Sequence, residues 1–152
     1  MAEQMSEQEM KNLVGRYQQY QYQAEGLMQQ INIARTSIAE LEKAIHTIEE
    51  LEKTDAQKDT LVPIGAGSYV HASLTKPDSV LLGVGAGVSL EKSNTEAKTI
   101  LSKRKDELAK LVESMSGTVD KLGKEMQTLQ AVFQKYAAEE QQAAASQIPQ
   151  AY

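Results

Sequence analysis

Apolar residues recur in alternating steps of three and four along two long stretches of the chain. This spacing is the a/d pattern of a coiled coil, so each stretch is predicted to be one long helix. The first a/d seam comprises Met10, Leu13, Tyr17, Tyr20, Ala24, Leu27, Ile31, Ala34, Ile38, Leu41, Ile45 and Ile48. The second comprises Leu101, Leu108, Val112, Met115, Val119, Leu122, Met126, Leu129, Phe133 and Tyr136, with Lys105 as its one polar interruption.

The two seams have equal length, which indicates that they pair with each other. Leu13 and Ile48 are five heptads apart, and so are Leu101 and Tyr136. We therefore expect an antiparallel coiled coil within the chain, with Leu13 and Tyr136 at the same end. This end, called the tip, also carries both chain termini. Gly15 and Gly26 each weaken a helix by about 1 kcal/mol relative to Ala, so stability is expected to fall toward the tip.

The segment between the helices has a different pattern. Short runs rich in Val, Ile, Leu or Tyr are bounded by Gly, Pro, Asp or Asn, which is typical of strands and turns. Four strands are predicted, at Leu61–Ile64, Ser68–Leu74, Ser79–Val84 and Val88–Leu90. Two copies of Gly-Ala-Gly separate them into two hairpins, and glycine supplies the positive φ of tight turns at Gly65, Gly67, Gly85 and Gly87. The predicted fold class is α+β, mainly α.

This pattern divides the chain into four predicted parts. Residues 1–53 form a first coiled-coil arm and residues 60–91 form the two β-hairpins. Residues 93–140 form the second arm, which Ser93 and Glu96 begin as a capping box. The remaining residues, 141–152, are rich in Ala and Gln and are predicted to be a mobile tail.

Composition and charge exclude several classes of function. The net charge of −5 argues against a nucleic-acid-binding protein. The chain has no Cys, and His46 and His71 are isolated, so neither a metal site nor a cofactor is expected. The Gly-Ala-Gly loops lack the context of nucleotide-binding motifs, and no catalytic constellation is recognised, so the chain is not expected to be an enzyme. No signal peptide or spanning segment is recognised, and a cytoplasmic location is expected.

Four short strands make a small core and leave apolar edges open, which predicts obligate oligomerisation through the hairpins. The residues expected at this interface are Leu61, Val62, Ile64, Tyr69, Val70, Leu74, Val80, Leu82, Val84, Val88 and Leu90. At the tip, by contrast, Met and aromatic residues are concentrated, and Tyr22 lies off the seam. Flexible groups of this kind suit the capture of varied apolar surfaces.

The stretch from Leu61 to Val70, LVPIGAGSYV, together with VGAGV at Val84–Val88, resembles the two hairpins of prefoldin alpha-type subunits. The doubled Gly-Ala-Gly and the equal heptad arms occur in the same order, over about residues 8–140. The resemblance implies an archaeal-type, ATP-independent co-chaperone that passes non-native proteins to a group II chaperonin. It further implies a hexamer of two alpha and four beta subunits, in which the hairpins join a β-barrel hub.

The heptad pattern and the resemblance together predict that the tip contacts client proteins. Opening of the distal seam, weakened by Gly15 and Gly123, would expose the tip residues. The client-binding residues expected are Met5, Met10, Leu13, Tyr17, Phe133, Tyr136 and Ile148. The alternative is a structural coiled-coil tether that binds one fixed helical partner.

Overall fold

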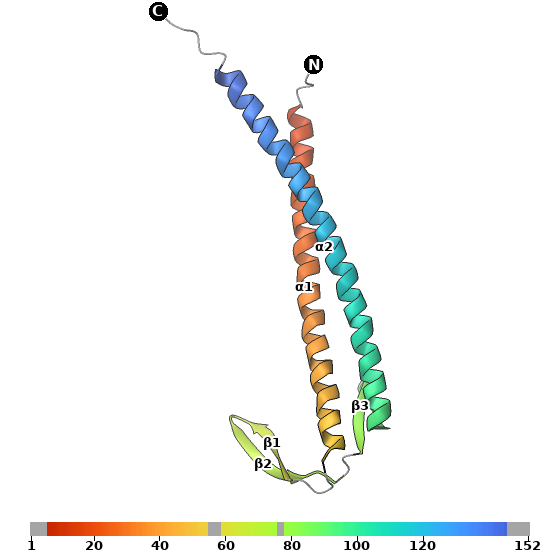
Figure 1. The fold of residues 1–152 in the computed structure, drawn as a ribbon. Helices are drawn as coiled ribbons and strands as arrows, with labels where there is room; N and C mark the ends of the chain where they lie inside the picture. Colours follow the sequence, from red (N-terminus) through yellow and green to blue (C-terminus); the bar gives the residue numbers. More distant parts are fainter. Residues whose placement is uncertain (1–5, 55–58, 76–77, 146–152) are drawn as a thin grey trace, which may run out of the picture. The chain divides into compact units, whose positions relative to one another are not determined.

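Two long helices flank two β-hairpins in the computed structural model, which describes residues 6–54, 59–75 and 78–145. Figure 1 shows these elements in chain order. They are α1 (Glu7–Glu52), β1 (Asp59–Gly65), β2 (Ser68–Ser73), β3 (Ser79–Gly85), β4 (Val88–Ser93) and α2 (Asn94–Ala145). The α+β class, mainly α, is confirmed. No helix in these ranges has the length and apolarity that a membrane crossing requires.

The chain divides into two compact units, and each long helix contributes to both. Unit 1 contains residues 1–33 and 111–152, and unit 2 contains residues 34–110. In both units, every a/d residue of the two predicted seams is buried or half-buried. Gly15 and Gly26 are exposed, as expected for positions off the seam. The period read from the sequence therefore identifies the apolar stripe of each helix.

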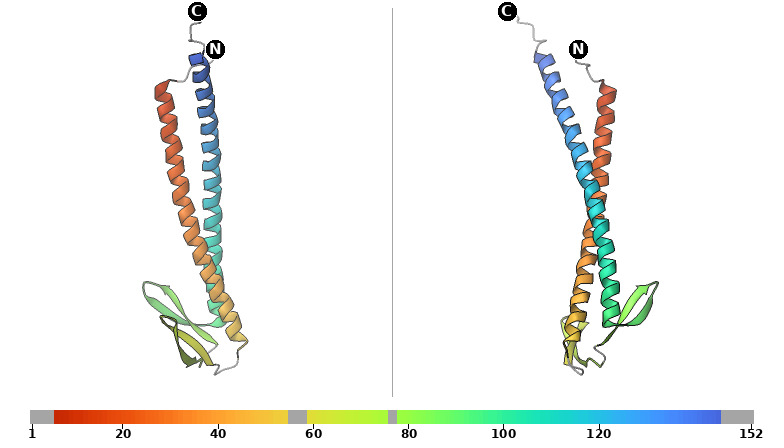
Figure 2. Two further views of the ribbon diagram at one scale, coloured as in Figure 1. Left: turned by 90° about the vertical axis from the view of Figure 1, so that its left-hand side faces the viewer. Right: turned by 45° about the vertical axis from the view of Figure 1, so that its right-hand side comes forward.

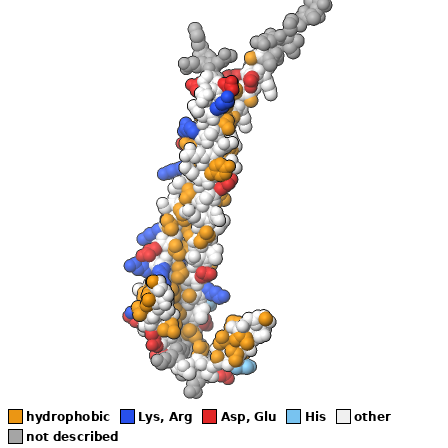
Figure 3. Space-filling model, turned by 180° about the vertical axis from the view of Figure 1, so that it is seen from behind, with side chains coloured by type: hydrophobic (Ala, Val, Ile, Leu, Met, Phe, Trp, Pro, Cys, Tyr) orange, Lys and Arg blue, Asp and Glu red, His pale blue; other side chains and the backbone are white. Residues whose placement is uncertain are grey.

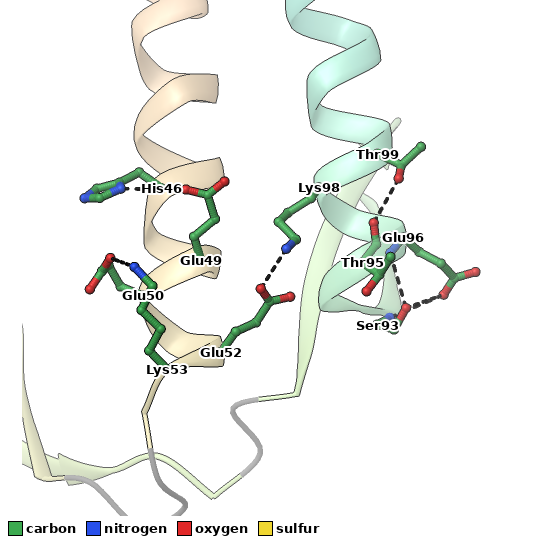
Figure 4. A network of polar contacts seen from close by, with 10 residues as sticks. All are labelled: His46, Glu49, Glu50, Glu52, Lys53, Ser93, Thr95, Glu96, Lys98 and Thr99. Carbon is green, nitrogen blue, oxygen red and sulfur yellow. Dashed lines mark hydrogen bonds and ion pairs between the residues drawn. The ribbon is translucent and has the colours of Figure 1, made fainter.

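In unit 2, the end of α1 packs against the start of α2. Ile48, Ala97 and Leu101 are buried in one cluster, which agrees with the predicted facing of Ile48 and Leu101. Two ion pairs join the helices beside this cluster. Lys98 Nζ lies 2.7 Å from Glu52 Oε2 (Figure 4), and Lys105 Nζ lies 3.9 Å from Glu42 Oε1. Lys105, the polar interruption of the seam, thus lies close to a carboxylate of the other helix.

The two hairpins are copies of each other in register and turn. Each forms a separate two-stranded antiparallel sheet (Figure 2). Pro63 pairs with Tyr69 and Gly65 with Ser68, and the same step recurs 20 positions later, where Gly83 pairs with Ser89 and Gly85 with Val88. Both hairpins therefore shift register by one residue immediately before the turn, which is the signature of a β-bulge.

The Gly-Ala-Gly loops are hairpin turns, as predicted. Ala66 and Gly67 have φ values of 47° and 73°, and Ala86 and Gly87 have 49° and 76°. Positive φ at both central residues of a two-residue loop defines a type I′ turn, which matches the right-handed twist of the strands. Alanine in this region carries a steric cost that glycine and asparagine avoid.

Replacing Ala66 with Asn is expected to stabilise the protein by about 0.5–1 kcal/mol, because Asn tolerates positive φ and Asn-Gly is the preferred type I′ pair. The free energy of unfolding from urea titrations would measure this gain. Gly67→Ala is the matched control and should destabilise by about 1 kcal/mol, since it places a side chain at the same positive φ. Equal urea midpoints for the parent protein, Ala66→Asn and Gly67→Ala would contradict the assignment of a type I′ turn.

Helix α2 begins with the predicted capping box. The Glu96 N–H donates to Ser93 Oγ, while the Ser93 hydroxyl and N–H both donate to Glu96 Oε2 (Figure 4). These hydrogen bonds, with the charge of Lys92, hold the pKa of the Glu96 carboxyl below its ordinary value of 4.5. The resulting stabilisation is present above pH 4.5 and is lost as the pH falls through the lowered pKa. A second capping box at Ser6 and Glu9 begins α1.

The C-terminal boundary differs from the predicted one. The second arm was expected to end at residue 140, with the tail beginning at 141, whereas α2 continues to Ala145. The added residues are Gln and Ala, which have high helix propensity and extend an existing helix without a new nucleus. The rest of the predicted tail lies outside the described residues.

Candidate functional site

The two hairpins expose a set of apolar side chains that we call the hairpin surface. Ile64 is 67% exposed and Tyr69 is 60% exposed, far more than a core residue would be. Figure 3 shows hydrophobic side chains on both hairpins. The hairpin surface comprises Leu61, Val62, Ile64, Tyr69, Val70, Leu81, Val84, Val88 and Leu90. An exposed set of this extent is a characteristic of an interaction site.

Both faces of the first hairpin contribute to this surface. Val62 pairs with Val70, so their side chains lie together on one face of β1 and β2. Leu61 pairs with His71, and Pro63 pairs with Tyr69, on the opposite face. Exposed apolar residues on both faces of one strand pair indicate that the hairpin is built to be covered on both sides.

The second hairpin is anchored within its own chain. Leu82 is only 7% exposed and packs with Ile48, Ala97 and Leu101, and Val80 lies against the same cluster. The guanidinium of Arg104 donates to the backbone oxygen of Gly83 at 3.0 Å. Figure 1 accordingly shows β3 beside α2.

This packing corrects part of the predicted interface. Leu82 and Val80 were expected to face another subunit, but they complete the core of unit 2. Leu74, which was also predicted at the interface, is half-buried and does not belong to the hairpin surface. The sequence prediction omitted Leu81, which is 77% exposed on the opposite face of β3. The alternation of strand side chains places Leu81 opposite to Leu82, but an unbroken Val-Leu-Leu run does not reveal which face is inward.

In unit 1, aromatic side chains connect the two helices. The rings of Tyr17 and Phe133 are 6.0 Å apart at an interplanar angle of 67°, an edge-to-face arrangement. The Gln130 side chain donates a hydrogen bond of 2.8 Å to the Tyr17 hydroxyl. We call these three residues the aromatic contact. Tyr17 was predicted as a tip residue, whereas the role of Gln130 is visible only in the structure.

The other predicted client-binding residues fall into two groups. Met10, Leu13 and Tyr136 are half-buried, as are Tyr17 and Phe133. Met5 and Ile148 lie outside the described residues. Tyr22, expected off the seam, is exposed, together with Val14, Met28 and Ile33. Of the seam groups named for client binding, Tyr17 and Phe133 are partly covered by each other across the helix pair.

The described residues offer little for chemistry. His46 and His71 are both exposed, and His46 Nδ1 lies 3.9 Å from Glu49. Within the part of the chain that the structure describes, no three His, Cys, Asp or Glu side chains are grouped so that they would hold a metal ion. The apolar surfaces are thus the principal candidates for function.

Comparison with known proteins identifies a family. The family profile described as "Prefoldin subunit" matches residues 20–139. The chain is 40% identical over 134 residues to prefoldin subunit alpha of Methanosarcina barkeri, covering 86% of this chain and 93% of that protein. It is 38% identical over 125 residues to prefoldin subunit alpha of Methanococcoides burtonii, covering 82% and 91% of the two chains.

A solved structure agrees with these relatives. A chain of filamentous PFD from Methanocaldococcus jannaschii, determined by cryo-EM, has a TM-score of 0.68 and 26% sequence identity to this chain. The match covers 77% of this chain and 97% of that chain. The doubled Gly-Ala-Gly hairpins between helices with equal heptad seams, the family profile and the relatives all agree: the chain belongs to the prefoldin family of chaperone subunits and is of the alpha type.

Proposed function

We propose that this chain is the alpha subunit of an ATP-independent, cytoplasmic co-chaperone that captures non-native proteins and passes them to a group II chaperonin. Prefoldin subunits assemble into oligomeric complexes. In the proposed complex, two alpha subunits and four beta subunits join their hairpins into a β-barrel hub. The distal helix pairs contact the client.

The observation that supports this proposal is the separation of two different apolar surfaces. The hairpin surface belongs to unit 2 and is carried by strands with fixed pairing. Such a surface suits a permanent subunit interface, because open strand edges and exposed aliphatic groups favour pairing with another chain. The Met and aromatic groups of unit 1 lie in a two-helix seam, where they have no thick core around them.

The client-binding role is assigned to the predicted tip residues. Met10, Leu13, Tyr17, Phe133 and Tyr136 are large, adaptable apolar groups. Met5 and Ile148 are included in the proposal as further tip contacts. Because Tyr17 and Phe133 contact each other across the helix pair, full exposure of these two rings to a client requires the helices of unit 1 to separate.

The decisive experiment compares aggregation of several unrelated denatured proteins with and without the assembled complex, in the absence of nucleotide. A co-chaperone should slow the aggregation of all of them. A structural tether should slow none and should bind one helical partner at fixed stoichiometry, and that result would replace the proposal.

Assembly is tested separately by the mass of the particle formed by this chain with and without a beta-type subunit. We expect a hexamer with the beta-type subunit. A stable lone monomer in both conditions would contradict the role given to the hairpin surface.

A further inference from the structure

The glycines of the two helices are all in unit 1. They are Gly15 and Gly26 in α1 and Gly117 and Gly123 in α2, whereas the helical stretches 34–52 and 94–110 of unit 2 have none. A Cβ added at any of the four would meet nothing within 4 Å. Close packing therefore does not require them, and alanine would make each helix more stable. Their common effect is to soften the helices of unit 1.

Two of these glycines lie at the same level of the helix pair. The contact between Tyr17 and Phe133 fixes how the helices align in unit 1. Gly26 follows Tyr17 by nine positions, and Gly123 precedes Phe133 by ten. At a rise of about 1.5 Å per residue, they are about 14 Å and about 15 Å from the aromatic contact, in the same direction along an antiparallel pair. Both helices are thus weakened at one cross-section.

Beyond this level, the aromatic contact joins the helices in a way that is easily reversed. Its hydrogen bond from Gln130 to Tyr17 is at the surface, where water can replace either partner at little cost. The ring pair is edge-to-face and only half-buried. Unit 2, by comparison, holds its helices with a buried cluster and two ion pairs.

We propose that Gly26 and Gly123 form a hinge from which the helix ends of unit 1, residues 7–25 and 124–145, separate when a client binds. The aromatic contact is the closure that opens, and its opening uncovers the ring faces with which Tyr17 and Phe133 meet. This inference rests on the proposed client-binding function. To that function, the inference adds the position at which the helices bend, Gly26 and Gly123, and the aromatic contact that holds the helices together in the absence of client.

The test is a distance measurement in the full chain within its native assembly. Because the chain has no Cys, Lys11→Cys and Glu139→Cys provide two unique sites for spin labels, and both positions are exposed. Pulsed electron resonance then gives the distribution of distances between the helix ends, with and without a chemically unfolded client protein. The labelled protein that keeps Gly26 and Gly123 should show a longer and broader distribution of distances between the two labels when client is added.

The hinge variant is Gly26→Ala with Gly123→Ala, and the matched control is Gly15→Ala with Gly117→Ala, whose glycines lie at different levels. The hinge variant should reduce the open population about tenfold and weaken client affinity by the same factor, because only the open state binds. The control variant should change the open population and the client affinity by less than threefold each.

Two results would overturn the inference in distinguishable ways. If the parent complex slows client aggregation but the hinge variant binds client and opens as the parent does, the hinge is wrong and the co-chaperone function stands. If the parent complex neither binds client nor slows its aggregation, the proposed function fails and the hinge fails with it.

Discussion

Deleting residues 1–17 and 133–152 is expected to abolish suppression of client aggregation while leaving the assembled complex intact. The deletion removes Met10, Leu13, Tyr17, Phe133 and Tyr136, the five residues of the proposed client-binding set that the structure describes. It leaves the hairpin surface and the buried cluster around Leu101 unchanged. Light scattering by an aggregating client should return to the level without chaperone, while the particle mass falls only by the deleted residues.

A shorter deletion, of residues 1–9 and 138–152, is the matched control. It keeps these five residues of the proposed client-binding set and removes Met5 and Ile148, so any loss of activity in it measures the contribution of the extreme ends. The tip assignment is wrong if the longer deletion still protects clients as well as the intact complex.

The second large effect is expected from charges on the hairpin surface. Val62→Lys combined with Val70→Glu should weaken assembly at least 100-fold, because burying each charge in a subunit interface costs several kcal/mol. The two residues face each other across the strand pair, so opposite charges keep a favourable pair within the hairpin itself. Analytical ultracentrifugation should show dissociated subunits whose helix content by circular dichroism is unchanged.

The control places the same two charges on a helix, as Gln19→Glu with Gln23→Lys. Both positions are exposed and lie four residues apart on α1, where the pair is mildly stabilising. This variant should assemble normally. If the hairpin variant also assembled normally, Val62 and Val70 would not lie in the interface.

Local patterns in the sequence predicted most of the architecture. The spacing from Met10 to Ile48 identifies the buried stripe of α1, because a coiled-coil seam depends on the sequence period alone. The equal length of the two seams predicted that Ile48 would meet Leu101. The hairpin turns at the two Gly-Ala-Gly sequences and the Ser93 capping box were equally predictable, since each depends on particular residues at fixed short spacing.

Features that depend on distant packing were not predictable in the same way. Whether Leu81 or Leu82 points inward depends on how β3 lies against the helices, and the apolar run that contains both is compatible with either choice. Gln130 is a polar residue beside the seam, and only the position of the Tyr17 hydroxyl gives it a role. Likewise, an Ala-rich segment has no stop signal that would locate the end of α2.

Lys105 and Glu42 have a consequence for how the chain finds its native alignment. Heptad repeats are nearly interchangeable, so two long helices can pair displaced by seven residues with little loss of apolar contact. Such a displacement would bring Lys105 either to Arg35, which repels it, or to Glu49. In the second case Lys98 would move from Glu52 to Asp59, which lies in a strand. Either displacement therefore loses at least one of the two ion pairs that join the helices, which favours the native alignment.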